Sequence, residues 1–322
     1  MQKTRIEWVK NPDGSQGWTL NPFTGCHNHT NGLCKGGGFP CYAYRLAHGR
    51  LKSRYLANEN VADNEIMTFP RHIECIADPF YPRFWPERLA EIQRGIDDYD
   101  YQTYIKQKPR GIFICDMSDL FGIGIPEEWT AKVLEAIADD CNSFHRFYLL
   151  TKQPQNLARW SPFPDNCWVG VTATDHNMLQ RATGHLRRIK ATIKYISLEP
   201  LLKWQEQNDK WLIEDWQAAC INWLIIGACT GTKVELLQAV NRIRGNNPPL
   251  DLALMPYGKR WTLQPPIDWV QEIVAAADKA GIPVFLKDNL HPLLSKQTAT
   301  RFHRAYPDYC ELRQEMPKEE GK

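Results

Sequence analysis

The chain has 322 residues, of which 43% are hydrophobic and 24% are charged, and its formal net charge is +2 at pH 7. This composition is typical of a globular protein with a sizeable core, and it excludes an intrinsically disordered chain. No run of about 18 apolar residues occurs and the N-terminus lacks the apolar core of a signal peptide. We therefore expect a cytoplasmic protein that neither spans a membrane nor is secreted.

A glycine- and proline-rich stretch at residues 21–44 holds three of the chain's ten cysteines: Cys26, Cys34 and Cys41. The glycines and prolines predict an irregular loop that can wrap closely around a ligand. Cysteine clusters in intracellular chains commonly bind metal, and three thiolates suit zinc or an iron–sulfur cluster. Zinc would need a further ligand such as His27 or His29, whereas three cysteines on a four-iron cluster leave one iron open. Three unrelated thiols in a loop are the alternative.

The N-terminal region is basic, because residues 1–60 carry eight Lys or Arg and only three acidic residues. This surplus of positive charge beside the cysteine loop could bind phosphate groups. The alternative is that the basic side chains form an ordinary solvent-exposed helix face. The next segment, residues 42–57, predicts a helix that Gly49 weakens in the middle.

The remaining chain alternates predicted strands and helices. Continuous apolar runs predict strands buried on both faces of a parallel sheet, at residues 111–115, 146–151, 167–172, 194–199, 222–227 and 283–288. Amphipathic patterns predict helices between them, at residues 126–141, 175–189, 233–245 and 268–281.

Two further segments, residues 18–21 and 66–70, bring the number of predicted strands to eight. Eight βα units predict a closed (βα)8 TIM-type barrel, with the cysteine loop after its first strand. We expect one α/β domain over residues 1–309 and a frayed C-terminal tail over residues 310–322. An open doubly wound sheet is the alternative, since it also alternates strands and helices.

In a βα barrel the reactive side chains collect at the C-terminal ends of the strands. Beyond the cysteine loop, the polar residues at those ends are Asp116, Ser118, Asp119, Thr151, Lys152, Thr172, Thr174, Glu199, Lys287 and Asp288. Structural roles are the alternative: the two aspartates of residues 116–119 could cap a helix, and either lysine could pair with Glu199 or Asp288.

Seven blocks keep their order over about residues 5–290: WTLNPFTGC with CYA, MSDLF (117–121), FYLLTKQPQNL (147–157), WVGVT (168–172), YISLEPLL (195–202), NWLIIG (222–227) and VFLK (284–287). Together they resemble the phage-type three-cysteine-motif family, an uncharacterised group of phage and bacterial proteins that looks related to radical S-adenosylmethionine (SAM) enzymes. Any one block alone would carry no such resemblance.

The resemblance implies a radical SAM enzyme in which Cys26, Cys34 and Cys41 bind a [4Fe–4S] cluster and SAM chelates the fourth iron. Reduction by an external electron donor would cleave SAM to a 5′-deoxyadenosyl radical, which abstracts hydrogen from an unknown substrate. A nucleotide or nucleic-acid base is the candidate substrate, given the phage association and the basic N-terminal region. The strand-end groups expected to hold SAM are Ser118, Lys152, Thr172 and Glu199.

The cysteine spacing departs from the commonest radical SAM pattern of three and then two intervening residues, because seven residues and then six intervene here. The segment KGGGFP (35–40) reads as an insertion, and its three glycines allow the loop to fold back. Two other hypotheses remain. One is a zinc-stabilised, non-enzymatic nucleic-acid-binding protein, and the other is a metal-independent enzyme using Lys152 or Lys287 as a base or Schiff-base nucleophile.

Overall fold

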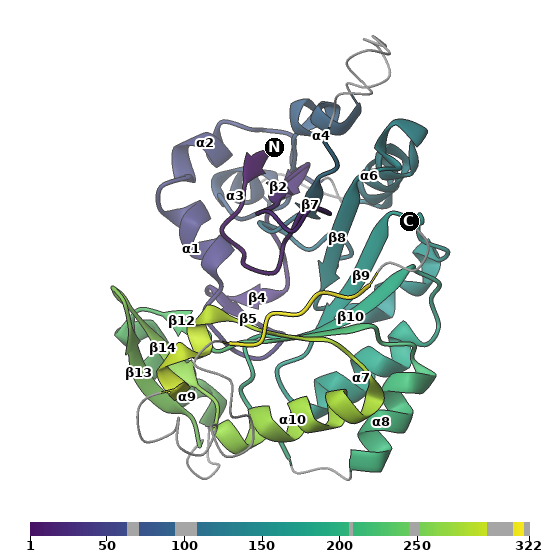
Figure 1. The fold of residues 1–322 in the computed structure, drawn as a ribbon. Coiled ribbons are helices and arrows are strands. Elements are labelled where there is room, and N and C mark those ends of the chain that lie inside the picture. Colours follow the sequence, from purple (N-terminus) through teal and green to yellow (C-terminus); the bar gives the residue numbers. More distant parts are fainter. Residues whose placement is uncertain (63–70, 94–107, 206–208, 245–250, 295–311, 319–322) are drawn as a thin grey trace. The chain divides into compact units, whose positions relative to one another are not determined.

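The computed structural model (Figure 1) describes residues 1–62, 71–93, 108–205, 209–244, 251–294 and 312–318. The chain forms two compact units. Unit 1 consists of residues 1–32, 41–170 and 189–192, and unit 2 consists of residues 33–40, 171–188 and 193–322. Within the described ranges, no helix is long and apolar enough to cross a membrane.

The main sheet has eight strands in the order β1-β2-β7-β8-β9-β10-β11-β15. All seven predicted strands that fall in the described residues are present, and the predicted strand at 66–70 lies outside them. The eighth strand is instead β1, a two-residue strand that pairs antiparallel with β2. Among the described residues, no pairing joins β15 back to β1 or β2. The predicted closed (βα)8 TIM-type barrel is therefore wrong, and the sheet is open and mostly parallel.

The prediction of a closed barrel was wrong because of the strands that it counted. It counted residues 66–70, which lie outside the described residues, and it missed β1, which lies outside the alternation of strands and helices. A parallel barrel needs every strand to be followed by a crossover to a parallel neighbour. The chain from β1 (Gln2–Lys3) to β2 (Trp18–Leu20) returns antiparallel instead, with Gln2 opposite Thr19. Such a pair terminates the parallel run at one edge.

Unit 1 carries most of the candidate site. Its other strands are β3 (Phe23–Thr24), β4 (His29–Thr30), β6 (Arg83–Phe84), β7 (Gly111–Ile114), β8 (Arg146–Thr151) and the first part of β9 (Cys167–Thr172). Its helices are α1 (Tyr42–His48), α2 (Lys52–Leu56), α3 (Arg71–Ala77), α4 (Pro86–Gln93), α6 (Glu127–Ala138) and the short 3-10 helices η1 (Asp140–Asn142), η2 (Pro154–Asn156) and η3 (Ala158–Trp160).

Two features of the sequence set the helix boundaries in unit 1. The single helix predicted over residues 42–57 is divided at Gly49, so that α1 and α2 are separate. A glycine lacks a side chain to stabilise helical backbone, which explains the break there. Helix α6 begins after Pro126, and Glu127 and Glu128 lie in its first turn, where acidic groups favour the helix dipole.

Unit 2 contains β5 (Leu33–Cys34), β10 (Ile193–Leu198), β11 (Trp223–Ile226), β12 (Cys229–Gly231), β13 (Ala253–Tyr257), β14 (Arg260–Gln264) and β15 (Val284–Leu286). Its helices are α7 (His176–Leu186), α8 (Asp209–Ala218), α9 (Lys233–Arg244), α10 (Ile267–Ala280) and η4 (Asp288–Leu294). The side chain of Asp175 accepts a hydrogen bond from the Met178 N–H at 2.7 Å and is the N-cap of α7, at the start of the helix predicted over residues 175–189. Gly281 ends α10 in the left-handed conformation, with φ of 70°.

The outer edge of β15 is covered by residues 312–318. Arg313 accepts a backbone hydrogen bond from Leu286 at 2.7 Å, and Glu315 donates one to Val284 at 3.0 Å. The indole N–H of Trp223 donates to the carbonyl oxygen of Glu315 at 2.9 Å. This part of the predicted frayed tail is therefore hydrogen bonded to the sheet as an antiparallel strap.

Candidate cofactor site

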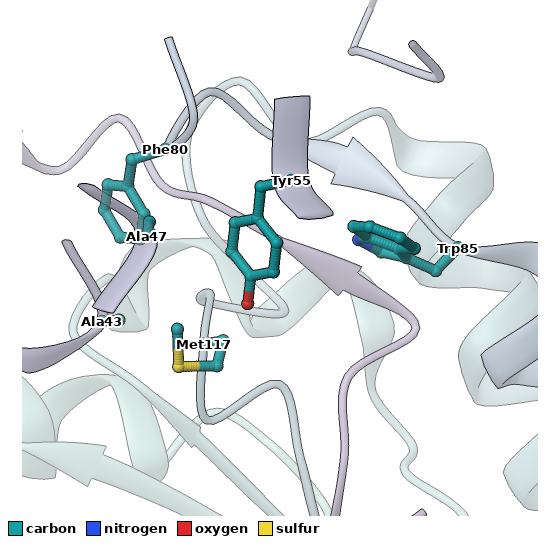
Figure 2. Close-up of a cluster of buried hydrophobic side chains, with 6 residues drawn as sticks. All are labelled: Ala43, Ala47, Tyr55, Phe80, Trp85 and Met117. Carbon is teal, nitrogen blue, oxygen red and sulfur yellow. The ribbon is translucent and has the colours of Figure 1, made fainter. Parts of the chain in front are cut away.

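Cys26 and Cys41 contact the same hydrophobic cluster in unit 1. The cluster consists of Ala43, Ala47, Tyr55, Phe80, Trp85 and Met117 (Figure 2). The Cys26 sulfur accepts a hydrogen bond from the Asn28 N–H at 3.2 Å, and the Cys41 sulfur accepts one from the Tyr44 N–H at 3.5 Å as the N-cap of α1. Both thiols are half-buried. Two of the three predicted ligands therefore share one apolar environment, with backbone N–H groups directed at their sulfurs.

Cys34 lies in the loop 33–40, which belongs to unit 2. Its backbone N–H donates to the Phe39 carbonyl at 2.9 Å, and its own carbonyl accepts from the Gly38 N–H at 2.7 Å. A Cβ atom at Gly37 would lie 2.5 Å from the hydroxyl oxygen of Thr174, so this position accepts only glycine without rearrangement. The predicted insertion is therefore a tightly packed turn, and Cys34 is buried in it.

The three thiols match a soft metal centre in chemistry, because thiolate sulfur is the preferred donor of iron–sulfur clusters and of many zinc sites. The structure does not show a metal site formed by these thiols. Among the described residues, no three His, Cys, Asp or Glu side chains form a group that could hold a metal ion. Cys26 and Cys41 belong to unit 1 and Cys34 to unit 2.

Ser118 is attached to the cysteine loop. Its hydroxyl donates a hydrogen bond to the carbonyl oxygen of Gly25, and the Gly25 N–H donates to the Met117 carbonyl at 3.0 Å. Gly25 has φ of 90°, and a Cβ atom there would lie 2.5 Å from the carbonyl oxygen of Tyr81. The turn after β7 therefore holds the residue that directly precedes Cys26.

Asp119 joins the turn after β7 to the end of β8. Its carboxylate accepts hydrogen bonds from the Thr151 hydroxyl at 2.7 Å, the Lys152 N–H at 3.0 Å and the Phe121 N–H at 3.1 Å. Burial raises the pKa of Asp119, and these hydrogen bonds and the charge of Lys152 oppose that rise. Asp119 thus fixes the half-buried Lys152, a predicted SAM contact, beside a buried carboxyl group.

Asp116 is half-buried and lies in a second group of polar contacts. Its carboxylate accepts a hydrogen bond from the Asn21 amide at 2.6 Å, and its backbone carbonyl accepts one from the exposed Tyr42 hydroxyl. Burial raises the pKa of Asp116, while the Asn21 hydrogen bond and the Arg88 charge lower it. Neither Asp116 nor Asp119 caps α6, because its N-cap is Pro126. The helix-cap alternative for these aspartates is therefore wrong.

His27 and His29, the alternative zinc ligands, pack on aromatic rings in unit 1. The ring centroid of His27 lies 4.8 Å from that of Tyr81, and the ring centroid of His29 lies 4.9 Å from that of Tyr44. A Cβ atom at Gly124 would lie 2.4 Å from Cδ2 of His27, so the loop after the Asp119 turn touches the residue that follows Cys26. The packing gives both imidazoles a structural role.

Thr172 and Glu199 are strand-end residues of unit 2. Thr172 is buried at the end of β9. Glu199 forms an ion pair with Lys287, which follows β15. This contact confirms one structural alternative for these residues, an ion pair between the two strand ends. Burial raises the pKa of the nearby Cys229 thiol to about 12, with the charges of Glu199 and Glu235 adding to the rise.

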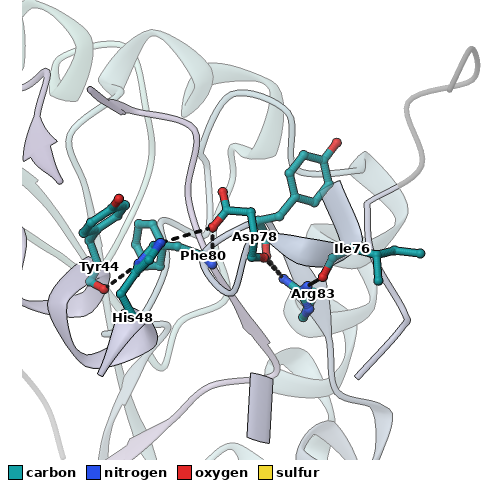
Figure 3. A network of polar contacts seen from close by, with 7 residues as sticks. Tyr44, His48, Ile76, Asp78, Phe80 and Arg83 are labelled. Carbon is teal, nitrogen blue, oxygen red and sulfur yellow. Dashed lines mark hydrogen bonds and ion pairs between the residues drawn. The ribbon is translucent and has the colours of Figure 1, made fainter. Parts of the chain in front are cut away.

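Arg83 is a residue of this region that sequence reasoning missed. It is fully buried, and its guanidinium donates to the carbonyl oxygens of Ile76 and Asp78, both at 2.6 Å (Figure 3). It also donates to the carbonyl oxygens of Tyr81 and Asn58, both at 2.9 Å. It thereby fixes the turn that presents the Phe80 carbonyl to the Cys26 N–H, a hydrogen bond of 3.1 Å. An arginine between a proline and an aromatic residue has no periodicity or motif that could have revealed this role.

Figure 3 also shows how α1 joins this turn. The Nδ1 atom of His48 lies 3.0 Å from the Tyr44 carbonyl oxygen, and its Nε2 atom lies 3.6 Å from the Asp78 carboxylate. The same carboxylate oxygen of Asp78 accepts a hydrogen bond from the Phe80 N–H at 2.8 Å. The helix that follows Cys41 and the turn that supports Cys26 are therefore connected by polar contacts.

An open, mostly parallel sheet with polar side chains and a cysteine loop at strand ends defines an α/β protein with a candidate cofactor site. The chain belongs to a family described as protein of unknown function (DUF5131), whose model matches residues 3–243. No curated protein and no solved structure matches the chain.

Proposed function

We propose that the protein is a cytoplasmic radical SAM enzyme of the three-cysteine-motif type, in which Cys26, Cys34 and Cys41 hold a [4Fe–4S] cluster. The observation that carries the proposal is that the Cys26 and Cys41 sulfurs contact one hydrophobic cluster and each accept a backbone N–H. Hydrogen bonds to the sulfurs and burial are the means by which proteins tune such clusters. When bound, the cluster and SAM supply reductive SAM cleavage and hydrogen abstraction.

The third proposed ligand, Cys34, is close in sequence to a residue that is hydrogen bonded to Cys41. The Cys41 N–H donates to the Gly32 carbonyl at 2.8 Å, which pins the two ends of the loop 33–40 together. Cys34 lies two residues beyond Gly32, so its Cα is within about 7 Å of the Gly32 Cα in any conformation. We propose that cluster loading rearranges this glycine-rich loop and brings the Cys34 sulfur to the cluster.

The residues proposed to hold SAM are Ser118, Lys152, Thr172 and Glu199. Lys152 and Glu199 carry the opposite charges that complement the carboxylate and amino groups of an amino acid, and Thr172 adds a hydroxyl. The Ser118 hydroxyl donates a hydrogen bond to the Gly25 carbonyl oxygen and so positions the cysteine loop, while its own oxygen can still accept a hydrogen bond.

The proposed substrate is a nucleotide or nucleic-acid base, and an external donor supplies the electron. Support comes from Arg50, Lys52 and Arg54, which are exposed on the segment of α1 and α2 that follows Cys41. Cations on an exposed surface attract phosphate-bearing molecules and raise their local concentration.

The test is anaerobic reconstitution with iron and sulfide, followed by iron and zinc analysis and optical spectroscopy. Wild-type protein is expected to be brown, with broad absorbance near ~400 nm from thiolate-bound iron. Cys26→Ala, Cys34→Ala and Cys41→Ala should each lose this absorbance. Cys220→Ala is the matched control, because Cys220 is an exposed thiol outside the loop, and it should behave as wild type. A colourless protein containing one tightly held zinc would establish the zinc alternative instead.

A second measurement separates cluster binding from SAM chemistry. Reduced, reconstituted protein incubated with SAM should form 5′-deoxyadenosine, or at least show a changed cluster spectrum when SAM is added. Lys152→Gln and Glu199→Gln should weaken the SAM response while leaving the iron content unchanged. A brown protein that does not respond to SAM would retain the cluster and refute the radical SAM assignment.

A further inference from the structure

The β13–β14 hairpin of unit 2 (Figure 1) ends in a tight turn. Tyr257 pairs with Arg260, so the connecting loop is only two residues, Gly258 and Lys259. Gly258 is the first central residue of the hairpin turn and has φ of 57°. Glycine adopts this left-handed conformation more easily than other residues. The turn is therefore a defined structure, and Gly258, Lys259 and Arg260 are all exposed on it.

Three cations lie on or against the hairpin, and we call them the basic tip: Lys259 and Arg260 on the hairpin itself, and Lys233 at the start of α9. Lys233 is connected to the hairpin, because its ammonium nitrogen lies 4.7 Å from the ring centroid of Trp261. No ion pair between any of the three and an acidic residue occurs in the described part of the chain. Elsewhere in unit 2, Arg187, Lys287 and Arg313 do have carboxylate partners. The basic tip therefore presents uncompensated positive charge to solvent.

Two aromatic side chains flank these cations. Tyr257 is opposite Arg260 in the register, so their side chains share one face of the hairpin. Trp261 is opposite Pro256 and points to the other face, where Lys233 covers it. Both aromatic residues are half-buried, and Trp261 also packs against the core cluster of Leu202, Cys229, Leu236 and Leu263. Each face of the hairpin thus combines a cation with an aromatic ring.

We propose that the basic tip is a binding site for single-stranded nucleic acid. Lys and Arg that neutralise phosphates release condensed counterions, and this drives binding without regard to sequence. Unpaired bases stack on accessible aromatic rings, so a cation beside an aromatic ring matches the repeating phosphate and base of a single strand. The proposal is independent of the cluster in the proposed function, since none of its residues belongs to the cysteine loop.

The test is fluorescence anisotropy of the full chain with a labelled single-stranded oligonucleotide of about 20 nucleotides, titrated at several salt concentrations. Wild-type protein should bind, and log K should fall linearly with log salt. Lys259→Gln/Arg260→Gln should weaken binding at least tenfold near 0.1 M salt and reduce the slope by about 1.4, because each single-strand phosphate contact contributes about 0.7. Arg181→Gln/Arg188→Gln removes two exposed cations of or beside α7 and should bind as wild type.

Three results would overturn the proposal: no binding by wild-type protein at about 50 mM salt, equal binding by the tip variant, or equal losses in tip and control variants. Circular dichroism of each variant confirms that its fold is intact. Phosphatidylserine vesicles form a further arm, and a tip variant that loses vesicle binding but keeps oligonucleotide binding would assign the tip to lipid instead. Cys34→Ala should bind the oligonucleotide as wild type, so the failure of either proposal is seen separately.

Discussion

The hydroxyl of Ser118 donates a hydrogen bond to the carbonyl oxygen of Gly25, the residue that directly precedes Cys26. A residue at the end of one buried strand thereby fixes a loop that lies more than ninety positions earlier in the chain. The contact connects the sheet to the proposed cluster ligands, and it makes the geometry of the loop sensitive to a single hydroxyl group.

Ser118→Ala removes this hydrogen bond and leaves the Gly25 carbonyl without its donor. The free energy of unfolding should fall by about 1 kcal/mol. Reconstituted protein should also lose iron faster than wild type, which absorbance under chelator measures. Ser143→Ala is the matched control, because the Ser143 hydroxyl also donates to a backbone carbonyl, that of Asp140, but on an exposed 3-10 helix. Equal iron loss in the two variants would show that Ser118 does not support the loop.

Gly124→Ala should disturb the cysteine loop through His27. The new Cβ atom would lie 2.4 Å from Cδ2 of His27, so the imidazole next to Cys26 must move, and the φ of 76° adds backbone strain. We expect a loss of about 2 to 3 kcal/mol in unfolding free energy, measured by denaturant titration. Gly14→Ala separates the two causes, because Gly14 has φ of 81° and open space around it, and strain alone should cost about 1 kcal/mol.

Arg83→Lys keeps the positive charge but loses the planar fork that reaches four backbone carbonyls. Several buried carbonyl groups then lack donors, and the free energy of unfolding should fall by about 3 kcal/mol. Amide hydrogen exchange should rise first in residues 76–83, where the turn supports Cys26. Arg159→Lys is the control: Arg159 forms an exposed ion pair with Glu127, and its replacement should change stability by less than about 1 kcal/mol.

His145 should make the protein less stable in mild acid. Burial lowers the pKa of His145 to about 4, helped by the charge of Arg110, whose backbone N–H donates to the Nδ1 atom of His145 at 3.1 Å. The unfolded chain binds a proton near pH 6.5 and the folded chain does not. Stability is therefore complete above pH 6.5 and falls as the pH drops toward 4, by about 3 kcal/mol in total.

Denaturant titrations between pH 4 and 7.5 measure this effect. In His145→Asn the side-chain oxygen can still accept the Arg110 N–H, but the group no longer titrates. The variant should thus lose less stability than wild type over the same range. An unchanged pH dependence in His145→Asn would assign the acid sensitivity to other groups.

The strands were predictable because each is a continuous apolar run, and the runs at 146–151 and 167–172 match β8 and β9 residue for residue. Closure was not predictable, since it depends on which edges pair, and β1 is two polar residues with no strand pattern. The strand-end rule pointed to Ser118 and Lys152, whose contact with SAM stays a prediction, and both form hydrogen bonds in unit 1. It could not reveal Arg83, whose role depends on four carbonyl groups that only the folded turn brings together.

The strap of residues 312–318 occupies backbone groups of β15 that would otherwise face solvent. An uncovered strand edge is a template for pairing with another chain. Proteolysis or truncation upstream of Glu315 would therefore expose the edge of β15 while leaving the core intact. The shortened protein should self-associate through this edge before it unfolds. Cleavage close to this strap during purification would expose the edge of β15 in the same way. An extension beyond the strap would leave the edge covered.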